Sequence, residues 1–309
     1  MTQVNYSNAF STESVQTRRL CLTTVSAIFA VITLTPILTK IFGASPRKAS
    51  ITALRFSFLI VAAVTWRRSG PGLASEAGLR IAGNPLRTWF RGFLMGSIPL
   101  ASYVVFLTIM DERVFEGIQN QGKFWWAVTK YMPLALIIGF LEDMLFFGFL
   151  ATLLGRRYSL AVVIYAVSHF LAPSKQFHWQ SPEWLVGWEA LGAMGESLAA
   201  ATSRPVEIFG LVLVGGTLAL LCRQTNNIWL AMGVHGGWYY VRTISRKLGE
   251  DLEGNHEWLF GTDRFYDGLL GWVAILTTGV LFWFSSRPEG REQEQASGDD
   301  DKDRQQDDH

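Results

Sequence analysis

Charged residues are scarce in this chain of 309 residues, where Asp, Glu, Lys and Arg together make up 17%. A soluble globular domain would carry about 25%. Hydrophobic residues account for 49%, and the few charges gather at the ends of apolar runs and in the C-terminal tail. The composition excludes an ordinary soluble domain and predicts an integral membrane protein.

Cysteine is scarcer still, with only Cys21 and Cys222, each at the edge of an apolar segment. Two such thiols lack the spacing of a metal or redox motif. The formal net charge is +1, and no nucleic-acid-binding motif occurs, so we predict no nucleic-acid partner. We also see no internal repeat of the kind that marks many transporters.

Apolar runs predict an all-α fold, a polytopic bundle of about eight transmembrane helices. The first run follows two arginines, but it is longer than the apolar core of a signal peptide and no cleavage site follows it. The predicted spans are 20–42, 50–66, 89–110, 125–158, 160–172, 206–221, a seventh that begins with 228–241, and 268–284.

Polar segments set the expected domain boundaries. Residues 1–19 form a polar N-terminal segment, 20–285 the membrane domain, and 286–309 a charged tail that should be disordered. The connection 173–204 is rich in tryptophan, which favours the membrane interface, so part of it should lie on the bilayer surface. Residues 242–267 are predicted to form a charged loop.

Paired arginines indicate the orientation. Eight spans place both termini on one side, together with the arginine pairs at 18–19, 67–68 and 156–157. Because cytoplasmic loops are enriched in Lys and Arg, we expect both termini in the cytoplasm. The expected location is a bacterial cytoplasmic membrane, with membrane lipid as a partner, and the oligomeric state is left open.

Two adjacent carboxylates, Glu142 and Asp143, interrupt the fourth apolar run. A carboxylate near the centre of a spanning helix costs about 2.5 kcal/mol or more, and such residues usually face a polar interior and serve a function. His169 and His235 lie in the fifth and seventh runs. Each histidine alone would more often be a packing residue, but the set of four predicts a functional polar site.

The turns between the runs place these side chains at similar depth. If the fourth and fifth runs form a hairpin about Arg156, then Glu142 and His169 both lie about 20 Å from the turn, at ~1.5 Å of rise per residue. His235 lies about 13 Å from the next turn, at Asn226, by the same measure. Three spans therefore bring ionisable groups to within one or two helical turns of each other in depth.

Two kinds of hydrolytic chemistry suit this set. Glu142 can act as a general base on water, with a histidine to orient the water and another donor to stabilise an oxyanion. Alternatively, Glu142, His169 and His235 can hold a catalytic zinc with an open fourth position. The chain contains no HExxH motif. The residues alone leave both alternatives open.

Three motifs carry a resemblance to a known family. They are LEDMLFFGFL at 141–150, YAVSHF at 165–170 and AMGVHGGWYY at 231–240. In order and surroundings they resemble the CAAX protease and bacteriocin-processing family, also called the Abi family of intramembrane proteases. Its first motif is two glutamates followed after three residues by Arg-Gly. Its second is an aromatic residue, three intervening residues and a histidine, and its third is a histidine, three intervening residues and usually an asparagine. The resemblance covers residues 125–245.

The resemblance implies a role for each matched residue. Glu142 would activate the water, and Asp143 stands at the second glutamate. His169 would hold the water, and His235 would stabilise the oxyanion. No cofactor is implied, and zinc remains the alternative that the residues themselves left open.

Two positions depart from the family pattern. Phe147 replaces the arginine, which removes a positive charge from beside the two acids. Tyr239 replaces the asparagine, and its hydroxyl can still donate a hydrogen bond.

Three functions therefore compete. The first is an endopeptidase that acts on a peptide or protein with a membrane-associated segment. The second is a catalytically degenerate relative that binds membrane partners or confers immunity, which Phe147 and Tyr239 favour. The third is a proton-coupled transporter with Glu142 as carrier, although the repeats and paired broken helices of a transporter are missing.

Overall fold

A computed structural model describes most of the membrane domain. The residues described are 25–41, 43, 45–69, 72–79, 83–115, 120–174, 177–178, 183–251, 256–262 and 264–285. Among them the only strands are two residues long, β1 (Arg113–Val114) and β2 (Glu250–Asp251), and they pair antiparallel. The predicted all-α membrane bundle is confirmed. The expectations for residues 1–19 and 286–309 lie outside the described residues.

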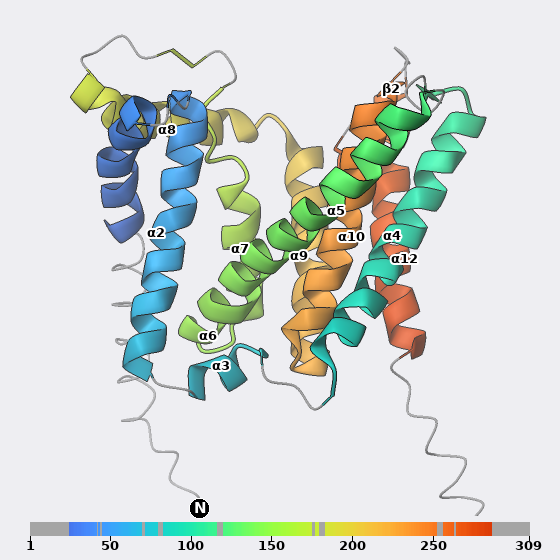
Figure 1. Ribbon diagram of the computed structural model, residues 1–309, viewed down its shortest axis with the longest axis horizontal. Coiled ribbons are helices and arrows are strands. Elements are labelled where there is room, and N and C mark those ends of the chain that lie inside the picture. The colour runs from blue at the N-terminus through green and yellow to red at the C-terminus, as the bar shows by residue number, and fades with distance from the viewer. Residues whose placement is uncertain are drawn as a thin grey trace, which may run out of the picture.

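The helices follow the predicted order of apolar runs (Figure 1). They are a first helix Val25–Ile41, α2 Pro46–Ser69, α3 Gly72–Glu76, α4 Pro85–Ile109, α5 Gln121–Asp143, the π-helix η2 Met144–Leu150, α6 Ala151–Leu153, α7 Tyr158–Ser168, the 3-10 helix η3 Glu183–Leu185, α8 Val186–Ala201, α9 Pro205–Thr225, α10 Ile228–Leu248, α11 Glu257–Phe260 and α12 Leu269–Ser285.

Three helical stretches are long and apolar enough to cross a bilayer, namely Pro85–Ile109, Gln121–Leu153 and Pro205–Thr225. Shorter apolar helices are Val25–Ile41, Tyr158–Ser168 and Leu269–Ser285. The protein is an integral membrane protein. The number of eight spans stays a prediction.

The C-terminal part of α10 corrects the predicted loop 242–267. The helix continues to Leu248 and carries Arg242, Arg246 and Lys247 in its last turns. Basic side chains are favoured there because the C-terminal end of a helix carries partial negative charge. The loop therefore starts later than predicted.

The connection 173–204 contains helix α8, which lies across the end of the bundle rather than along it (Figure 1). The side chains of Trp184 and Trp188 are exposed. A helix in this position agrees with the predicted placement on the bilayer surface, which stays a prediction.

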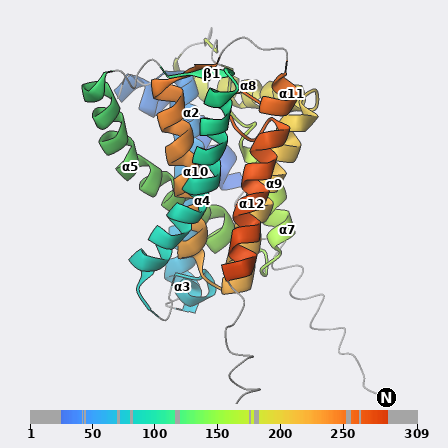
Figure 2. The same cartoon turned by 90° about the vertical axis from the view of Figure 1, so that its right-hand side faces the viewer.

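Glycines let α10 pack directly on α4 and α5 (Figures 1 and 2). A Cβ at Gly92 of α4 would lie 2.2 Å from the Leu230 carbonyl oxygen, and one at Gly233 of α10 would lie 2.1 Å from the Trp89 carbonyl oxygen. Small residues four apart allow this close approach in membrane helices. On the other side of α10, a Cβ at Gly139 of α5 would clash with the backbone there.

Two hairpin turns lie side by side at one end of the bundle, below α7 and α10 in Figure 1. Arg156 and Asn226 both adopt left-handed conformations, with φ of 63° and 48°. The Arg156 guanidinium donates a hydrogen bond to the Asn226 side-chain oxygen. This contact fixes the register that the depth argument assumed.

Candidate active site

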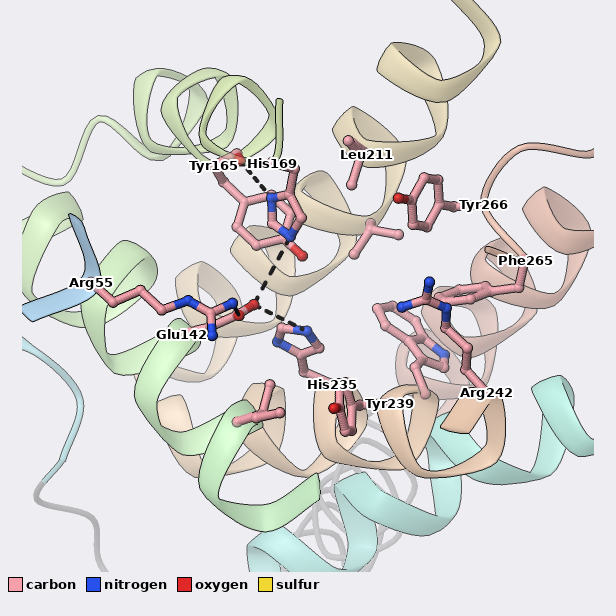
Figure 3. Close-up of a pocket in the computed structure, with 13 residues that line it drawn as sticks. Arg55, Glu142, Tyr165, His169, Leu211, His235, Tyr239, Arg242, Phe265 and Tyr266 are labelled. Atoms are coloured by element: carbon pink, nitrogen blue, oxygen red, sulfur yellow. Dashed lines mark hydrogen bonds and ion pairs between the residues drawn. The ribbon is translucent and has the colours of Figure 1, made fainter. Parts of the chain in front are cut away.

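The Glu142 carboxylate is the centre of the polar cluster (Figure 3). Its Oε2 atom lies 4.0 Å from Nε2 of His169 and 3.8 Å from Nε2 of His235. Its Oε1 atom accepts a hydrogen bond of 2.9 Å from the Arg55 guanidinium. The structure thus brings the three predicted residues together and adds a fourth, and the four come from α2, α5, the end of α7 and α10.

His169 has a defined tautomer. Its Nδ1 atom lies 2.9 Å from the Tyr165 carbonyl oxygen. A carbonyl oxygen only accepts, so Nδ1 carries the hydrogen and donates it. In the neutral ring, Nε2 is then an acceptor that faces Glu142. The Tyr165 ring packs against the imidazole, with centroids 4.5 Å apart, and limits its rotation.

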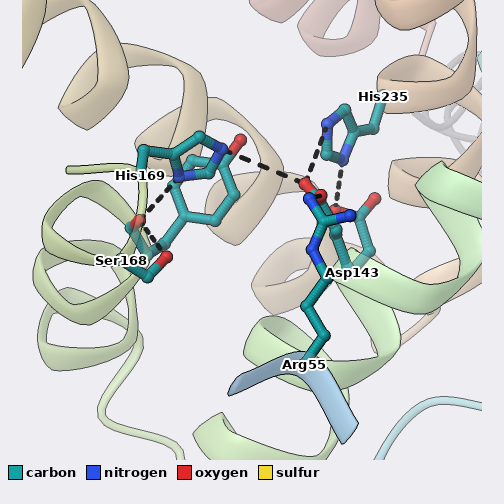
Figure 4. Close-up of polar contacts among 7 residues, drawn as sticks. Arg55, Asp143, Ser168, His169 and His235 are labelled. Carbon is teal, nitrogen blue, oxygen red and sulfur yellow. Dashed lines mark hydrogen bonds and ion pairs between the residues drawn. The ribbon is translucent and has the colours of Figure 1, made fainter. Parts of the chain in front are cut away.

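Asp143 faces His235 (Figure 4). Its Oδ1 atom lies 2.8 Å from Nδ1 of His235, and the carboxylate is fully buried. The other oxygen, Oδ2, has no hydrogen-bond partner among the described residues. A carboxylate on one ring nitrogen orients a histidine and stabilises its positive form, as second-shell partners of catalytic and metal-bound histidines do.

The α-helical geometry of α5 ends directly after Glu142 and Asp143. Met144–Leu150 forms the π-helix η2, a rare geometry that often occurs at functional sites. It turns Phe147 into the hydrophobic core, where the ring is 2% exposed and packs against Tyr165 at 5.6 Å between centroids. Position 147, where the family has an arginine, therefore holds a residue of the hydrophobic core in this protein.

Arg55 of α2 corrects the expectation that the acids lack a neighbouring positive charge. Its guanidinium is 2.9 Å from Glu142, so another helix supplies the charge that Phe147 cannot. The signal was present in the sequence, because Arg55 is a charged residue inside the apolar run 50–66. We took a charged residue within an apolar run as a sign of a functional site at Glu142, but we did not extend this reasoning to Arg55.

A cavity of about 230 Å³ opens in front of Glu142, which we call the catalytic cavity (Figure 3). Tyr239 lines it beside His235, as the sequence predicted for a site residue, whereas Asp143 lies behind the lining. The further lining residues, to which the sequence assigned no role, are Ile138, Tyr165, Leu211, Val214, Trp238, Arg242, Phe265 and Tyr266. Tyr266 lies in the connection before α12. Burial raises the pKa of its hydroxyl above the ordinary value, so Tyr266 is neutral at physiological pH.

The described residues contain no group of three or more His, Cys, Asp or Glu side chains arranged to hold a metal ion. Glu142, His169 and His235 come nearest, with separations of 3.8 and 4.0 Å between Oε2 and the Nε2 atoms. Ligands about 2.0–2.2 Å from a tetrahedral zinc would be about 3.4 Å apart. The three side chains would have to move closer to bind zinc.

Comparison with protein families identifies the segment that carries this cluster. The family model "Type II CAAX prenyl endopeptidase Rce1-like" matches residues 124–241. This match covers the three motifs and confirms the resemblance of the segment to this family. No curated protein and no solved structure matches the chain.

The Rce1-like segment runs from α5 into α10 and contains all five predicted site residues. It agrees with the range 125–245 to which the sequence resemblance was assigned. Arg55 and Tyr266 lie outside the segment, as does Arg242 by one residue. The catalytic cavity is therefore completed by parts of the chain that the family match does not cover.

Proposed function

We propose that the protein is an intramembrane endopeptidase in which Glu142 activates a water molecule to hydrolyse a peptide bond. The observation that carries this proposal is the position of Glu142 Oε2 between the Nε2 atoms of His169 and His235. The Rce1-like family match supports the reaction class.

Glu142 and His169 would hold the nucleophile together. Their facing atoms, Oε2 and Nε2, are both acceptors and are 4.0 Å apart. That distance is too long for a direct hydrogen bond, but two acceptors at this distance can share the two hydrogens of one water. Glu142 takes one proton as the hydroxide attacks the carbonyl carbon, and later gives it to the leaving amine.

His235 would stabilise the oxyanion of the tetrahedral intermediate. With Nδ1–H donated to Asp143, the doubly protonated ring keeps Nε2–H free to donate to the oxyanion. Asp143 supplies the negative charge that stabilises this imidazolium. Loss of one such donor typically costs about 10²–10³ in kcat.

Arg55 would hold the Glu142 carboxylate in position. The guanidinium binds Oε1 and leaves Oε2 directed at the two histidines. The positive charge lost at position 147 is thus available from α2, which favours an active enzyme over a degenerate relative.

The substrate is proposed to be a peptide with a membrane-associated segment, and the name of the matching family specifies a prenyl group. A second cavity of about 160 Å³ borders Glu142 and Arg55, and we call it the apolar cavity. Its apolar lining consists of Ile51, Leu54, Leu145, Phe146, Leu171 and Ala172. This lining suits a hydrocarbon group next to the scissile bond.

The test uses the purified protein in lipid with two substrate sets, farnesylated C-terminal peptides and membrane-anchored leader peptides. Wild type, Glu142→Gln and the control Glu196→Gln on exposed α8 are compared, each with and without a strong chelator. We expect cleavage by wild type and the control, and none by Glu142→Gln. Loss of activity with chelator would assign the site to zinc chemistry, and unchanged cleavage by Glu142→Gln would overturn the proposal.

A further inference from the structure

Tyr165 of α7 has a hydroxyl group to which the catalytic steps above assign no role. Its side chain is 2% exposed and lines the catalytic cavity. His169 also borders two neighbouring cavities, which are the apolar cavity and a cavity of about 500 Å³ that we call the basic cavity, because several arginines line it. Tyr165 lines neither of these two, so among the three its side chain borders the space in front of Glu142.

The Tyr165 ring is held by its neighbours. It lies edge-on to Phe146, with 5.3 Å between the centroids and 90° between the planes, and it packs against Phe147 at 5.6 Å. A Cβ at Gly215 of α9 would lie 2.9 Å from Cδ1 of the ring, so α9 can approach the ring this closely only with a glycine there. A ring confined in this way holds its hydroxyl in one place, which is the preorganisation that stabilises a transition state.

Tyr165 lies next to both histidines of the candidate site. Its ring centroid is 4.5 Å from that of His169 and 6.3 Å from that of His235, whose plane it meets at 77°. In Figure 3 the hydroxyl is at the end of the ring that points toward the space between the two histidines and Glu142. The hydroxyl therefore faces the space in which a substrate carbonyl would be attacked.

The hydroxyl is available to a ligand. Apart from those of the helical backbone, the hydrogen bonds of Tyr165 among the described residues use its carbonyl oxygen, which accepts from the Ser168 hydroxyl at 2.7 Å and from the His169 ring at 2.9 Å. A tyrosine hydroxyl is protonated at neutral pH and donates one hydrogen bond. Because a buried donor without a partner is unfavourable, we expect this hydroxyl to pair with a ligand group in the cavity.

The oxyanion is the group of the reaction that has room for a second donor. A water between Glu142 and His169 gives its hydrogens to these two acceptors, and Glu142 passes a proton to the leaving amine, so neither step needs the hydroxyl. His235 donates one hydrogen bond to the oxyanion, whereas a carbonyl oxygen has two lone pairs and can accept a second. Tyrosine and histidine side chains both occur among the donors of oxyanion holes.

We propose that the Tyr165 hydroxyl donates the second hydrogen bond to the oxyanion of the tetrahedral intermediate, which makes Tyr165 a catalytic residue beside His235. The hydroxyl keeps its proton throughout. Its hydrogen bond strengthens as the carbonyl oxygen gains negative charge and weakens when the carbonyl forms again. This inference rests on the proposed endopeptidase function and adds a residue to its transition-state stabilisation.

Tyr165→Phe removes the hydroxyl and keeps the ring that packs against His169. With a farnesylated peptide in lipid, we expect kcat to fall about 10²-fold with little change in KM, because the contact forms in the transition state. The matched control is Tyr131→Phe of α5, which should keep the wild-type kcat because Tyr131 lines none of the three cavities. Circular dichroism and size-exclusion profiles show whether each variant folds.

An ester substrate separates the oxyanion from the leaving group. An alcohol leaves with less need of a proton than an amine does, whereas the oxyanion is the same with both substrates. In single-turnover cleavage, Tyr165→Phe should therefore slow the ester and the amide by similar factors. A defect confined to the amide would assign the hydroxyl to protonation of the leaving amine and would overturn the inference.

A tetrahedral analogue measures the same contact without cleavage. The analogue is a farnesyl-cysteine peptide trifluoromethyl ketone, whose hydrate has two hydroxyl groups on a tetrahedral carbon and no charge. We expect it to bind Tyr165→Phe roughly tenfold or more weakly than wild type. The uncut peptide should bind Glu142→Gln with the same affinity whether or not Tyr165→Phe is added, because the ground-state carbonyl gains little from the contact.

The outcomes separate the inference from the proposed function. Equal kcat for Tyr165→Phe and wild type, with Glu142→Gln inactive, would overturn the inference and leave the proposed function standing. Cleavage by Glu142→Gln at the wild-type rate would overturn the proposed function and the inference with it. If wild type cleaves neither substrate, the analogue decides, since weaker binding to Tyr165→Phe supports the inference and equal binding or none overturns it.

Discussion

Each ionisable residue of the candidate site has a partner that fixes which of its atoms faces the cavity. The Tyr165 carbonyl oxygen sets the tautomer of His169, Asp143 binds the inner nitrogen of His235, and Arg55 binds one oxygen of Glu142. Three reactive atoms remain and point at one another. Substitution of a partner should therefore change the chemistry of the residue that it holds, while the reactive side chains themselves remain in the site.

Asp143→Asn should lower kcat by roughly a hundredfold, with little change in KM. The amide keeps the shape of the side chain but removes the negative charge that stabilises the His235 imidazolium in the transition state. Steady-state cleavage of the best peptide substrate in lipid measures both constants. An unchanged kcat in folded protein would contradict the role assigned to His235.

Arg55→Leu should reduce kcat/KM by about tenfold or more, because Glu142 loses the guanidinium that holds its Oε1 atom and leaves Oε2 directed at the two histidines. Arg55→Lys should retain part of the activity, since it keeps the charge but not the guanidinium fork. The control is Arg91→Leu on α4, which lines neither the catalytic cavity nor the apolar cavity. Equal activity of Arg55→Leu and wild type would show that this ion pair has no part in catalysis.

Phe147→Arg should destabilise the protein, although it restores the family residue. The side chain at 147 is buried against Tyr165, and an unpaired charge buried there costs several kcal/mol. Thermal unfolding in detergent should give a lower Tm for Phe147→Arg than for Phe147→Leu. A Tm equal to that of wild type, with higher activity, would show that the arginine reaches the cavity.

At the scale of elements, α10 matters most, because it carries His235, Tyr239 and Arg242 and packs on both α4 and α5. Its glycines bring the backbones into contact, and this close approach sets the distance between Asp143 and His235. The register of α10 against α5 is thus part of the site geometry.

Gly233→Val should separate α10 from α4 and lower the yield of folded protein sharply. Its Cβ would lie 2.1 Å from the Trp89 carbonyl oxygen, and backbone cannot move aside as a side chain can. Gly216→Val on α9 is the matched control, because a Cβ there meets nothing within 4 Å. Similar yields and Tm values for both variants would contradict this packing.

Helical rise and the two turns were enough to predict that Glu142, His169 and His235 meet. Both turns are local features, one at Arg156 and one at Asn226, so their position could be read from the chain. The partner of Glu142 could not, because the contact between Arg55 and Glu142 joins residues 87 positions apart and depends on how α2 packs. The π-helix that buries Phe147 likewise leaves no pattern in the spacing of apolar residues.

At the scale of the whole molecule, three cavities meet at His169. One holds the reactive groups, one is mostly apolar, and one is basic. The apolar cavity suits the hydrocarbon group of the proposed substrate. Outside the Rce1-like segment, α2 lines all three cavities, and the connection before α12 lines the catalytic cavity and the basic cavity.

The most direct test of the account compares single-turnover cleavage of a farnesylated peptide by wild type and Glu142→Gln in the same lipid. The amide cannot accept a proton from water, so general-base catalysis, typically about 10²–10⁴ in rate, should be lost while the peptide still binds. The account predicts a rate for Glu142→Gln at least a hundredfold below wild type. A Glu142→Gln protein that cleaves at the wild-type rate would contradict it.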